Sequence, residues 1–359
     1  FKNIIPENQI YLNNKYLKLD SYIFKLAEKY IASIFKEPDQ SIDRDQDRDT
    51  ETEKHSYLNP EEQLQILYVI DCRYLINKMS RVRFWAIEHL AKRENVNMQL
   101  TGPGFLNYNM KKSIQQNILD LKTEFHMVIW YKPLDDVCKF DSKIALPYPC
   151  CIRYNEMWDV EWTRKEINLS TVNIGSKQDV YCPNVIISHH KNDWEKYKEL
   201  YKEDKTKLFF YNPHHSNPKI FRPLKIRNTD KNIEKDIDVL ISGVTNEQHY
   251  PFKNRLFKIL LKYRQTHLRK YNIYVHKHPG YNSKINFLNI NQTRYNRLIN
   301  RSKICIACTS KYRYRLGKYV EMAMTGSVVC GDIPYEDSSF LEFVIDVNMD
   351  MTDIEIINK

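Results

Sequence analysis

The sequence predicts an α/β protein with two consecutive Rossmann-like domains. Short apolar runs, typical of buried strands, alternate with amphipathic stretches typical of helices. This alternation stops in a polar and basic stretch with a proline, FRPLKIRNTDKNIEK at residues 221–235, and then starts afresh. The chain has 359 residues, which is enough for two domains of ordinary size. Strand, helix, strand in repetition predicts parallel sheets with right-handed crossovers.

In the first half, the predicted strands are QILYVID (65–71), VNMQLTGPGF (96–105), HMVIWYKP (126–133), CCIRYN (150–155), NVIISHH (184–190) and KLFFYNP (207–213). The amphipathic stretches between them predict helices at 80–94, 111–124, 159–169 and 191–202. Before these elements, residues 19–35 have a helical pattern, and the mixed-charge run at 41–55 has no apolar anchor. That run predicts a solvated linker.

In the second half, the predicted strands are DIDVLISG (236–243), YNIYVHKH (271–278), KICIACTS (303–310) and SVVCGDI (327–333). Helices are predicted at 250–265, 292–302 and 316–325. The predicted organisation is therefore an N-terminal extension over 1–60, an N-terminal Rossmann-like domain over 61–225 and a C-terminal one over 226–359. Ligands of such sheets bind outside the carboxyl ends of the strands, so we expect the site in a cleft between the halves.

The formal net charge of +10 favours an anionic partner, such as a phosphorylated small molecule, a nucleic acid or a membrane surface. No run of about 18 apolar residues predicts a membrane span, and the start of the sequence lacks the core of a signal peptide. The eight cysteines have no framework spacing, which favours reduced thiols and a cytoplasmic protein. Cys305 and Cys308 lie in a predicted strand whose geometry points them to opposite faces, which argues against zinc.

The stretch YRYRLGKYVEMAMTG at 312–326 is the strongest candidate for a ligand site. Its helix is predicted to begin near Leu316 and Gly317 and to stop at Gly326. The residues expected to face the sheet recur at helical spacing and are Leu316, Val320, Ala323 and Met324. A helix start offers unpaired N–H groups and a positive dipole, which suit a diphosphate.

Charged side chains surround this predicted helix start. Arg313, Arg315 and Lys318 are cationic donors for phosphate oxygens. Glu321, one turn into the helix, is predicted to accept hydrogen bonds from vicinal ribose hydroxyls. The alternative is that Glu321 only pairs with Arg or Lys on a solvated face.

Other candidates follow the predicted strands. In the second half, Gly243, His278 and Ser310 lie at strand ends, and Arg255 lies in the first turns of a helix, where surface solvation is the alternative. In the first half, Gly102 and Gly104 allow close backbone approach to a ligand, although an ordinary turn also explains them. His276 and His278 share a strand face, but without a nearby Asp, Glu or Cys set we expect no metal site.

A sugar hydroxyl needs a positioned base to become a nucleophile near neutral pH. Asn155, Glu156 and Asp159 follow one strand, with Glu156 the candidate base and Asp159 a competing helix cap. His189 and His190 follow another strand and are candidate bases too, with Asp193 to orient them or to cap a helix.

The segment KYVEMAMTGSVVCGDIP resembles the donor-binding helix of GT-B glycosyltransferases of the "glycosyl transferases group 1" type. Further blocks resemble one uncharacterised branch of that superfamily, and they span residues 64–335: LTGPGF, IRYNEMWD, SHHKND, FYNP, FRP, DVLISG with HYPFKNRL, and HKHPGY. The resemblance excludes the first sixty residues.

The resemblance implies two Rossmann-like domains facing across a cleft. It implies a nucleotide-diphosphate sugar as substrate, held mainly by the C-terminal domain, with the acceptor held by the N-terminal one and no cofactor or obligatory metal. Carried over by motif, Glu321 binds the donor ribose, and the backbone of Arg315 to Lys318 binds the diphosphate. One departure is that Arg313 stands where retaining members often carry a second glutamate, so a retaining mechanism is not implied.

The leading hypothesis is therefore a cytoplasmic glycosyltransferase that moves a sugar to an acceptor hydroxyl of a glycan, a protein or a small molecule. A basic nucleic-acid-binding protein is the alternative from another class, but the cations are spread along many helices and no nucleic-acid motif is visible. A GT-B relic that binds a nucleotide sugar without turnover is a third. The sequence ends soon after the last strand, at IEIINK, where a GT-B fold normally continues with helices, so a longer parent protein is expected.

Overall fold

The computed structural model describes residues 12–18, 21–34, 63–77, 82–131, 138–139, 141, 144, 146–148, 150–154, 185–203, 205, 208–226, 229, 231–278, 290–336 and 342–359. The charged run predicted at 41–55 and the helix predicted at 159–169 lie outside these residues.

The first sheet has six strands in the order β2-β1-β3-β4-β5-β6. These strands are β1 (Leu64–Val69), β2 (Val96–Thr101), β3 (Met127–Tyr131), β4 (Cys150–Tyr154), β5 (Val185–Ser188) and β6 (Leu208–Tyr211). The pairs of β1 with β2 and β3, of β3 with β4 and of β4 with β5 are all parallel. The chain leaves β1 to one side for β2 and returns to its other side for β3, which is the strand-order reversal of a doubly wound sheet.

The helices of this half are α3 (Cys72–Asn77), α4 (Val82–Ala91), α5 (Ile114–Asp120) and α7 (Lys191–Leu200). Ser113 caps α5, because its side chain accepts from the Gln116 N–H. Helix α5 packs Ile114 and Ile118 against Leu67, Val69 and Val128 of the sheet. Helix α3 is an element that the sequence pattern did not predict.

Helix α2 (Ser21–Ile34) confirms the helical pattern predicted at residues 19–35, and a short helix that was not predicted, α1 (Asn14–Leu17), precedes it. Leu12 and Leu17 are buried, and the Asn13 N–H donates to the Gly104 carbonyl over 2.8 Å. The Tyr16 hydroxyl donates to buried Asp71, just after β1, over 2.8 Å. Helix α1 and the residues just before it therefore pack against the ends of β1 and β2.

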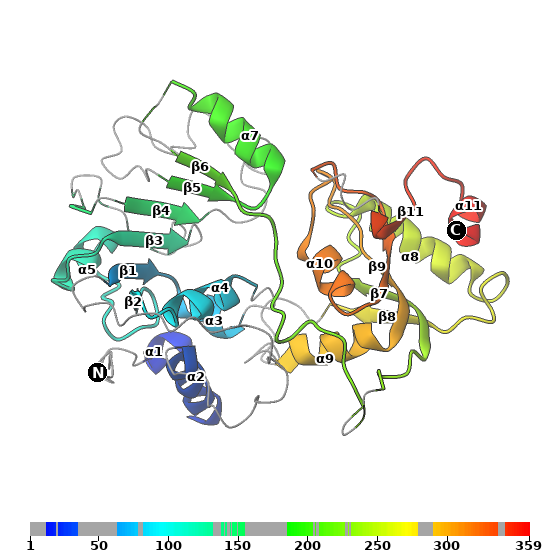
Figure 1. Ribbon diagram of the computed structural model, residues 1–359, viewed down its shortest axis with the longest axis horizontal. Helices are drawn as coiled ribbons and strands as arrows, with labels where there is room; N and C mark the ends of the chain where they lie inside the picture. Colours follow the sequence, from blue (N-terminus) through cyan, green and yellow to red (C-terminus); the bar gives the residue numbers. More distant parts are fainter. Residues whose placement is uncertain are drawn as a thin grey trace. The chain divides into compact units, whose positions relative to one another are not determined.

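The second sheet has five strands in the order β11-β10-β9-β7-β8. Its strands are β7 (Ile237–Gly243), β8 (Ile273–Lys277), β9 (Ser302–Ile306), β10 (Val328–Gly331) and β11 (Val344–Asp346). All four neighbouring pairs are parallel. The order again reverses at the first strand, since β8 lies on one side of β7 and β9 on the other. Figure 1 shows the helices around this sheet, which are α8 (Pro251–Tyr263), α9 (Ile290–Asn300), α10 (Gly317–Ala323) and α11 (Asp353–Asn358).

Alternate residues of the second sheet fill two apolar cores, as the period of two requires. Leu240 and Cys305 pack with Ile299, Tyr319 and Met322, from α9 and α10. Their neighbours Ile241 and Ile306 pack on the opposite face with residues of α8 and α11, which are Phe252, Leu256 and Ile356. Helices therefore cover both faces of the sheet.

The predicted α/β class with two consecutive parallel sheets is confirmed by these two sheets. Helix α10 begins at Gly317 as predicted, but its predicted buried face is wrong in detail. Tyr319 and Met322 are its fully buried residues, whereas Ala323 is exposed. Tyr319 can be buried because its hydroxyl donates to the Asp332 carbonyl over 2.5 Å.

The chain folds into two compact units. The first holds residues 1–156, 170–187 and 203–208, and the second holds 157–169, 188–202 and 209–359. Helix α7 thus belongs to the second unit. The predicted domain boundary at residues 225 and 226 stays a prediction.

No helix within the described ranges has the length and apolar character needed to cross a membrane. The cysteines whose side chains are described, Cys72, Cys138, Cys305, Cys308 and Cys330, form no disulfide.

Candidate functional site

The second sheet has a cavity of about 320 Å³ at the carboxyl ends of β7 and β8. The residues that line it are Ile241, Gly243, Val244, Thr245, Phe257, Val275, His276, Lys277 and His278. It lies beside β7, the strand at which the order reverses, which is the usual ligand position in a doubly wound sheet. This cavity is built from the second unit alone.

Two lysines meet at Gly243, the last residue of β7. Gly243 has a φ of +89°, and a Cβ built there would lie 3.0 Å from Lys253 Nζ and 3.2 Å from Lys318 Cε. Lys253 comes from the first turn of α8 and Lys318 from the first turn of α10. A glycine is needed here because a side chain would strain the backbone and displace both lysines.

Lys253 is a buried cation without a compensating charge. The residue is 5% exposed, and no ion pair or hydrogen bond joins its side chain to any residue in the described part of the chain. Its ammonium lies 5.9 Å from the centroid of the Tyr250 ring. Burial, and then the nearby charge of Lys318, lowers the pKa of Lys253 to about 8. An unpaired buried ammonium is costly, so this arrangement suits a site that receives an anion.

The amino end of α8 adds to this positive field. Helix α8 has 13 residues, begins with Pro251, and has no side-chain hydrogen bond to its cap. Its first N–H groups therefore lack an intrahelical partner, and its dipole is positive at this end.

Lys318 is held by neighbours that Lys253 lacks. Its Nζ donates to the Tyr295 hydroxyl over 3.0 Å and lies 3.8 Å from a Glu321 carboxylate oxygen. The Tyr295 hydroxyl shares a 2.8 Å hydrogen bond with Ser242. Because an ammonium can only donate, the Tyr295 hydroxyl accepts from Lys318, and either hydroxyl can donate in the Tyr295–Ser242 bond. Burial lowers the pKa of Lys318, but Tyr295 and Glu321 outweigh it, so the pKa is raised.

Glu321 does not lie on a solvated face, since its side chain is only 13% exposed. Burial raises the pKa of Glu321, and the Lys318 charge opposes that shift. No hydrogen bond joins the Glu321 carboxylate to another residue within the described ranges. Its oxygens are therefore placed to accept from a ligand hydroxyl beside the lysine pair.

His276 and His278 border the same site at the end of β8. The His276 ring stacks on Tyr295 with centroids 5.9 Å apart. Burial, followed by the charges of Lys318 and, for His278, Lys253, lowers the pKa of both histidines. Both are therefore neutral at pH 7.

Other residues predicted for the donor site lie elsewhere in the second unit. The Arg255 guanidinium donates to the carbonyls of Met349 and Met351, over 2.6 and 2.5 Å, and so fixes the segment before α11. Arg313 is exposed and donates to the Ile333 carbonyl over 3.1 Å. Ser310 is buried, and its hydroxyl accepts from the Tyr312 N–H over 3.3 Å.

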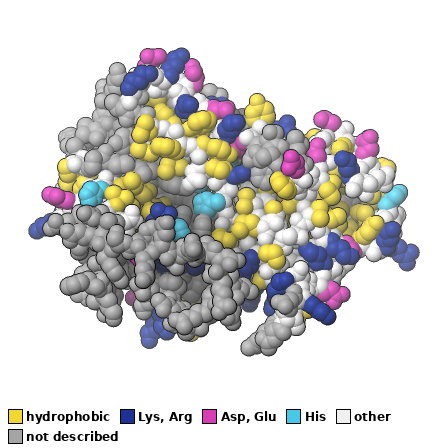
Figure 2. Space-filling view, viewed as in Figure 1, with side chains coloured by type: hydrophobic (Ala, Val, Ile, Leu, Met, Phe, Trp, Pro, Cys, Tyr) yellow, Lys and Arg dark blue, Asp and Glu magenta, His cyan; other side chains and the backbone are white. Residues whose placement is uncertain are grey.

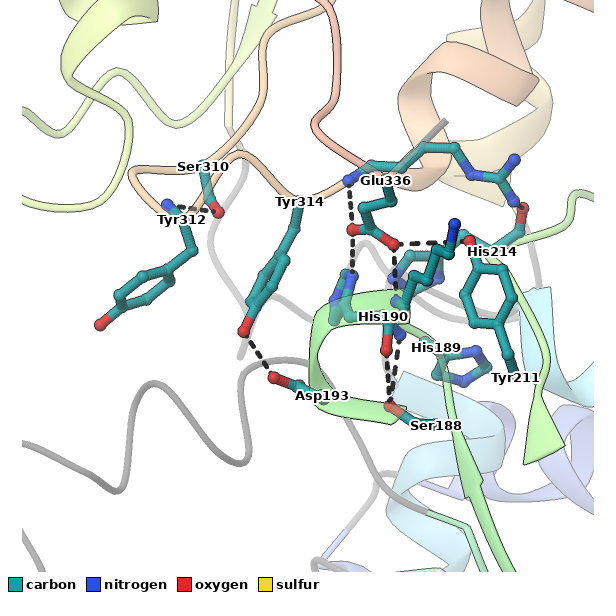
Figure 3. A network of polar contacts seen from close by, with 12 residues as sticks. Ser188, His189, His190, Asp193, Tyr211, His214, Ser310, Tyr312, Tyr314 and Glu336 are labelled. Carbon is teal, nitrogen blue, oxygen red and sulfur yellow. Dashed lines mark hydrogen bonds and ion pairs between the residues drawn. The ribbon is translucent and has the colours of Figure 1, made fainter. Parts of the chain in front are cut away.

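Arg315 belongs to a buried polar network that also contains His189, His190 and Asp193 (Figure 3). The carboxylate of Glu336 lies at its centre. Both histidines are at most 2% exposed, and the Tyr314 hydroxyl donates to Asp193 over 2.6 Å. The structure thus places these candidate bases and the predicted phosphate ligand Arg315 in a packed network, away from the lysine pair.

Gly102 and Gly104 follow β2 in the first unit. A Cβ on Gly102 would lie 2.2 Å from the Ile70 carbonyl oxygen, and one on Gly104 would lie 2.8 Å from Cys72 Cβ. Both glycines thus have a packing reason of their own, and their role towards an acceptor stays a prediction. Asn155, Glu156 and Asp159 lie outside the described residues.

Lys253 and Tyr295 were not predicted from the sequence, whereas Ser242 is recognisable there as a polar residue at a strand's carboxyl end. Lys253 stands in an amphipathic helix, where most lysines are solvated, so its residue type gave no signal. A usable signal was its position in the first turn of the helix after the Gly243 strand. Within the described residues, no group of three or more His, Cys, Asp or Glu side chains is arranged to hold a metal ion.

No protein-family model matches the chain. No curated protein matches it either.

Several solved structures are similar to the chain. One is the pneumococcal O-GlcNAc transferase GtfA in complex with UDP and GlcNAc, at 12% identity and a TM-score of 0.40; the match covers 68% of this chain and 50% of that one. Another is sucrose-phosphate synthase from Thermosynechococcus elongatus, at 8% identity and a TM-score of 0.43, covering 82% and 88%. A third is the glycotransferase of kitacinnamycin, at 8% identity and a TM-score of 0.35, covering 83% and 91%.

This chain spans about half the length of the first of these proteins. A putative UDP-N-acetylglucosamine 2-epimerase from Listeria monocytogenes is also similar, at 8% identity and a TM-score of 0.43, covering 82% and 86%, so the similar structures include both glycosyltransferases and an epimerase. TM-scores below 0.5 at these identities do not establish a shared activity, so the function is argued from the lysine pair and its neighbours.

Proposed function

We propose that the chain is a glycosyltransferase whose second unit binds a nucleotide-diphosphate sugar at the carboxyl edge of its sheet. The observation that supports this most is the unpaired buried ammonium of Lys253 beside Lys318, at the start of an uncapped helix. Two cations that meet at Gly243, one of them in the first turn of α8, match the charge of a diphosphate. The inference that this diphosphate carries a sugar comes from the GT-B-type fold and the sequence resemblance.

Each residue has a distinct part in this proposal. Lys253 and Lys318 hold the phosphate oxygens and stabilise the charge that develops as the nucleoside diphosphate leaves. Glu321 accepts from the ribose hydroxyls, since its carboxylate is beside the lysines and not otherwise hydrogen-bonded among the described residues. Gly243 leaves room for the phosphates between the two lysine side chains.

The charge distribution supports a small anion more than a nucleic acid. Around the second sheet, several exposed cations are joined to carboxylates, in the pairs Lys258–Glu247, Lys262–Asp353, Arg301–Asp236 and Lys303–Asp238. Figure 2 shows Lys and Arg side chains interspersed with acidic and hydrophobic ones on the visible face. A nucleic-acid surface needs neighbouring cations whose charge is not already offset.

Glu321→Gln tests the ribose contact. The variant keeps the shape of the side chain but loses the charge that strengthens hydrogen bonds from hydroxyls. We expect the parent protein to bind uridine diphosphate more tightly than its 2′-deoxy form, and the variant to lose about tenfold of that preference. Calorimetric titration measures both affinities. Glu247→Gln, which changes an exposed carboxylate paired with Lys258 of α8, is the control, and an unchanged preference in Glu321→Gln refutes the ribose role.

The pH dependence of the affinity tests whether the charge of Lys253 holds the anion. Because the pKa of Lys253 is lowered to about 8, its charge is present below that pH and is lost as the pH rises through it. We expect the affinity for uridine diphosphate to be flat from pH 6.5 to 7.5 and to fall by up to about tenfold per unit above pH 8. Titration of the parent and of Lys253→Met checks this, because the variant lacks the titrating group and keeps a flatter profile.

Turnover is the direct test of the enzymatic part. A panel of sugar nucleotides is incubated with the protein and with glycan, peptide and small-molecule acceptors, and release of the nucleoside diphosphate is followed. Transfer that Lys318→Met abolishes supports a glycosyltransferase. Tight binding without release for any acceptor leaves a protein that only binds sugar nucleotides.

A further inference from the structure

Glu336 is a buried carboxylate that joins three separate segments of the second unit (Figure 3). Its side chain has no exposed surface. Oε1 accepts from the Arg315 N–H over 2.8 Å and faces His190 Nδ1 at 3.1 Å. Oε2 accepts from the Lys191 N–H over 2.9 Å and from the Tyr211 hydroxyl over 3.4 Å. Each oxygen thus has two partners, which is what keeps a carboxylate stable away from water.

Two of these donors are backbone N–H groups, those of Lys191 and Arg315. Lys191 is the first residue of α7, a helix of ten residues, so its N–H has no intrahelical acceptor. A carboxylate at this position also complements the helix dipole. The other backbone donor, Arg315, lies in the loop between β9 and α10. Glu336 therefore links the start of α7 directly to that loop.

Further contacts attach the same loop to the same turn of α7. The Tyr314 ring stacks on His190 with centroids 4.0 Å apart, and its hydroxyl donates to Asp193 over 2.6 Å. The Arg315 guanidinium donates to the His214 carbonyl over 3.0 Å. The loop is thus fixed by side chains on both sides of its Arg315 N–H.

The loop ends where the lysine pair begins. Only Leu316 and Gly317 separate Arg315 from Lys318, and no side chain caps α10. Earlier in the loop, Arg313 has a φ of +58°, an uncommon conformation for a residue other than glycine. Such a conformation persists when the surrounding contacts hold it. The backbone that carries Lys318 thus directly follows a loop that is held by its own contacts.

We propose that Glu336 is a positioning residue, which ties the loop at residues 311–317 to the start of α7 and thereby holds Lys318 where it meets the bound anion. In this inference, only the presence of a bound anion at Lys318 rests on the proposed function. The tie between Glu336 and the loop is independent of it. Glu336 itself does not contact the lysine pair in this arrangement, so it acts through the backbone at Arg315.

Glu336→Gln removes the tie with little change of shape. A carboxamide has one acceptor oxygen and one amino group, so it cannot accept from both the Arg315 and the Lys191 N–H. We expect hydrogen exchange of the backbone amides at 311–318 to become faster without ligand, and the affinity for uridine diphosphate to fall about tenfold. Glu342→Gln, an exposed carboxylate in the same part of the chain, is the control.

A double-mutant cycle separates positioning from a general loss of structure. If Glu336 acts through Lys318, then Glu336→Gln lowers the affinity about tenfold in the parent but less than about twofold in the Lys318→Met background. An equal effect in both backgrounds overturns the inference. Tyr314→Phe is the second variant, since it keeps the ring on His190 and removes the hydroxyl bond to Asp193. It is expected to act in the same direction, and unchanged exchange and affinity in it overturn the inference even if Glu336→Gln does not fold.

The two readouts distinguish the two proposals. If the parent binds no nucleoside diphosphate, the proposed function fails, while faster exchange at 311–318 in Glu336→Gln still supports the tie. If the parent binds and Glu336→Gln changes neither exchange nor affinity, the proposed function stands and the tie is wrong.

Discussion

Lys253→Met is expected to make the protein more stable and to reduce its affinity for nucleoside diphosphates about 100-fold. A lysine whose pKa falls from 10.5 to about 8 opposes folding at pH 7 by on the order of 3 kcal/mol. Methionine keeps the apolar stem and removes the buried charge. The affinity falls because the unpaired ammonium is the group that the phosphate would neutralise. A stability cost located at a binding site is a common feature of functional residues.

Urea unfolding at pH 7 and at pH 10 measures the first effect. Below pH 8 the folded and unfolded chains are both protonated at Lys253, so the full cost applies; between pH 8 and 10.5 the folded chain loses its proton first and the cost shrinks. The stability gain of Lys253→Met should therefore be large at pH 7 and small at pH 10. Lys258→Met, an exposed lysine of the same helix, should change neither stability nor affinity. A Lys253→Met protein that is less stable at pH 7 contradicts this assignment of a buried, unpaired charge.

Lys318→Met is expected to reduce the affinity about as much, about 100-fold, but to destabilise the protein. Its ammonium offsets the buried carboxylate of Glu321 and donates to Tyr295. Without it, Glu321 is left as an uncompensated buried acid, and its pKa rises further because the opposing charge of Lys318 is gone. We expect a loss of about 1 to 2 kcal/mol at pH 7, scaled down because the pair is partly exposed.

The opposite signs of the two stability effects make the pair informative. In Lys318→Met, adding Glu321→Gln should restore stability but not affinity, since the buried charge is then removed together with its partner. Urea unfolding and calorimetric titration of both variants provide the comparison. Equal stability changes for Lys253→Met and Lys318→Met would show that the two lysines do not differ in their surroundings.

Much of the second half could be predicted from sequence, because its strands are apolar and their ends carry polar residues. The pattern placed Gly243, His278, Lys318 and Glu321 at strand and helix ends, and the structure brings these four to one edge. The bounds of α10 were also predictable. Gly326 marks the end of the helix, and the residues before Leu316 have no apolar period.

The directions of the side chains could not be predicted. Arg313, Arg315 and Lys318 look alike in sequence, yet only Lys318 faces Gly243, because the loop before α10 turns Arg315 towards His214. The contacts that accompany the burial of His190 include Glu336, which lies about 145 residues further along the chain and gave no local signal. Lys253 was missed because a lysine in an amphipathic helix is usually solvated, and only the tertiary fold shows that its ammonium is buried beside Gly243.

A crystal structure of the protein with a nucleotide-diphosphate sugar decides whether the lysine pair is a diphosphate site. We expect phosphate oxygens within hydrogen-bond distance of both Lys253 Nζ and Lys318 Nζ, and a ribose hydroxyl that donates to Glu321. A ligand bound in any other place, with the two ammonium groups left without an anion, would contradict this expectation.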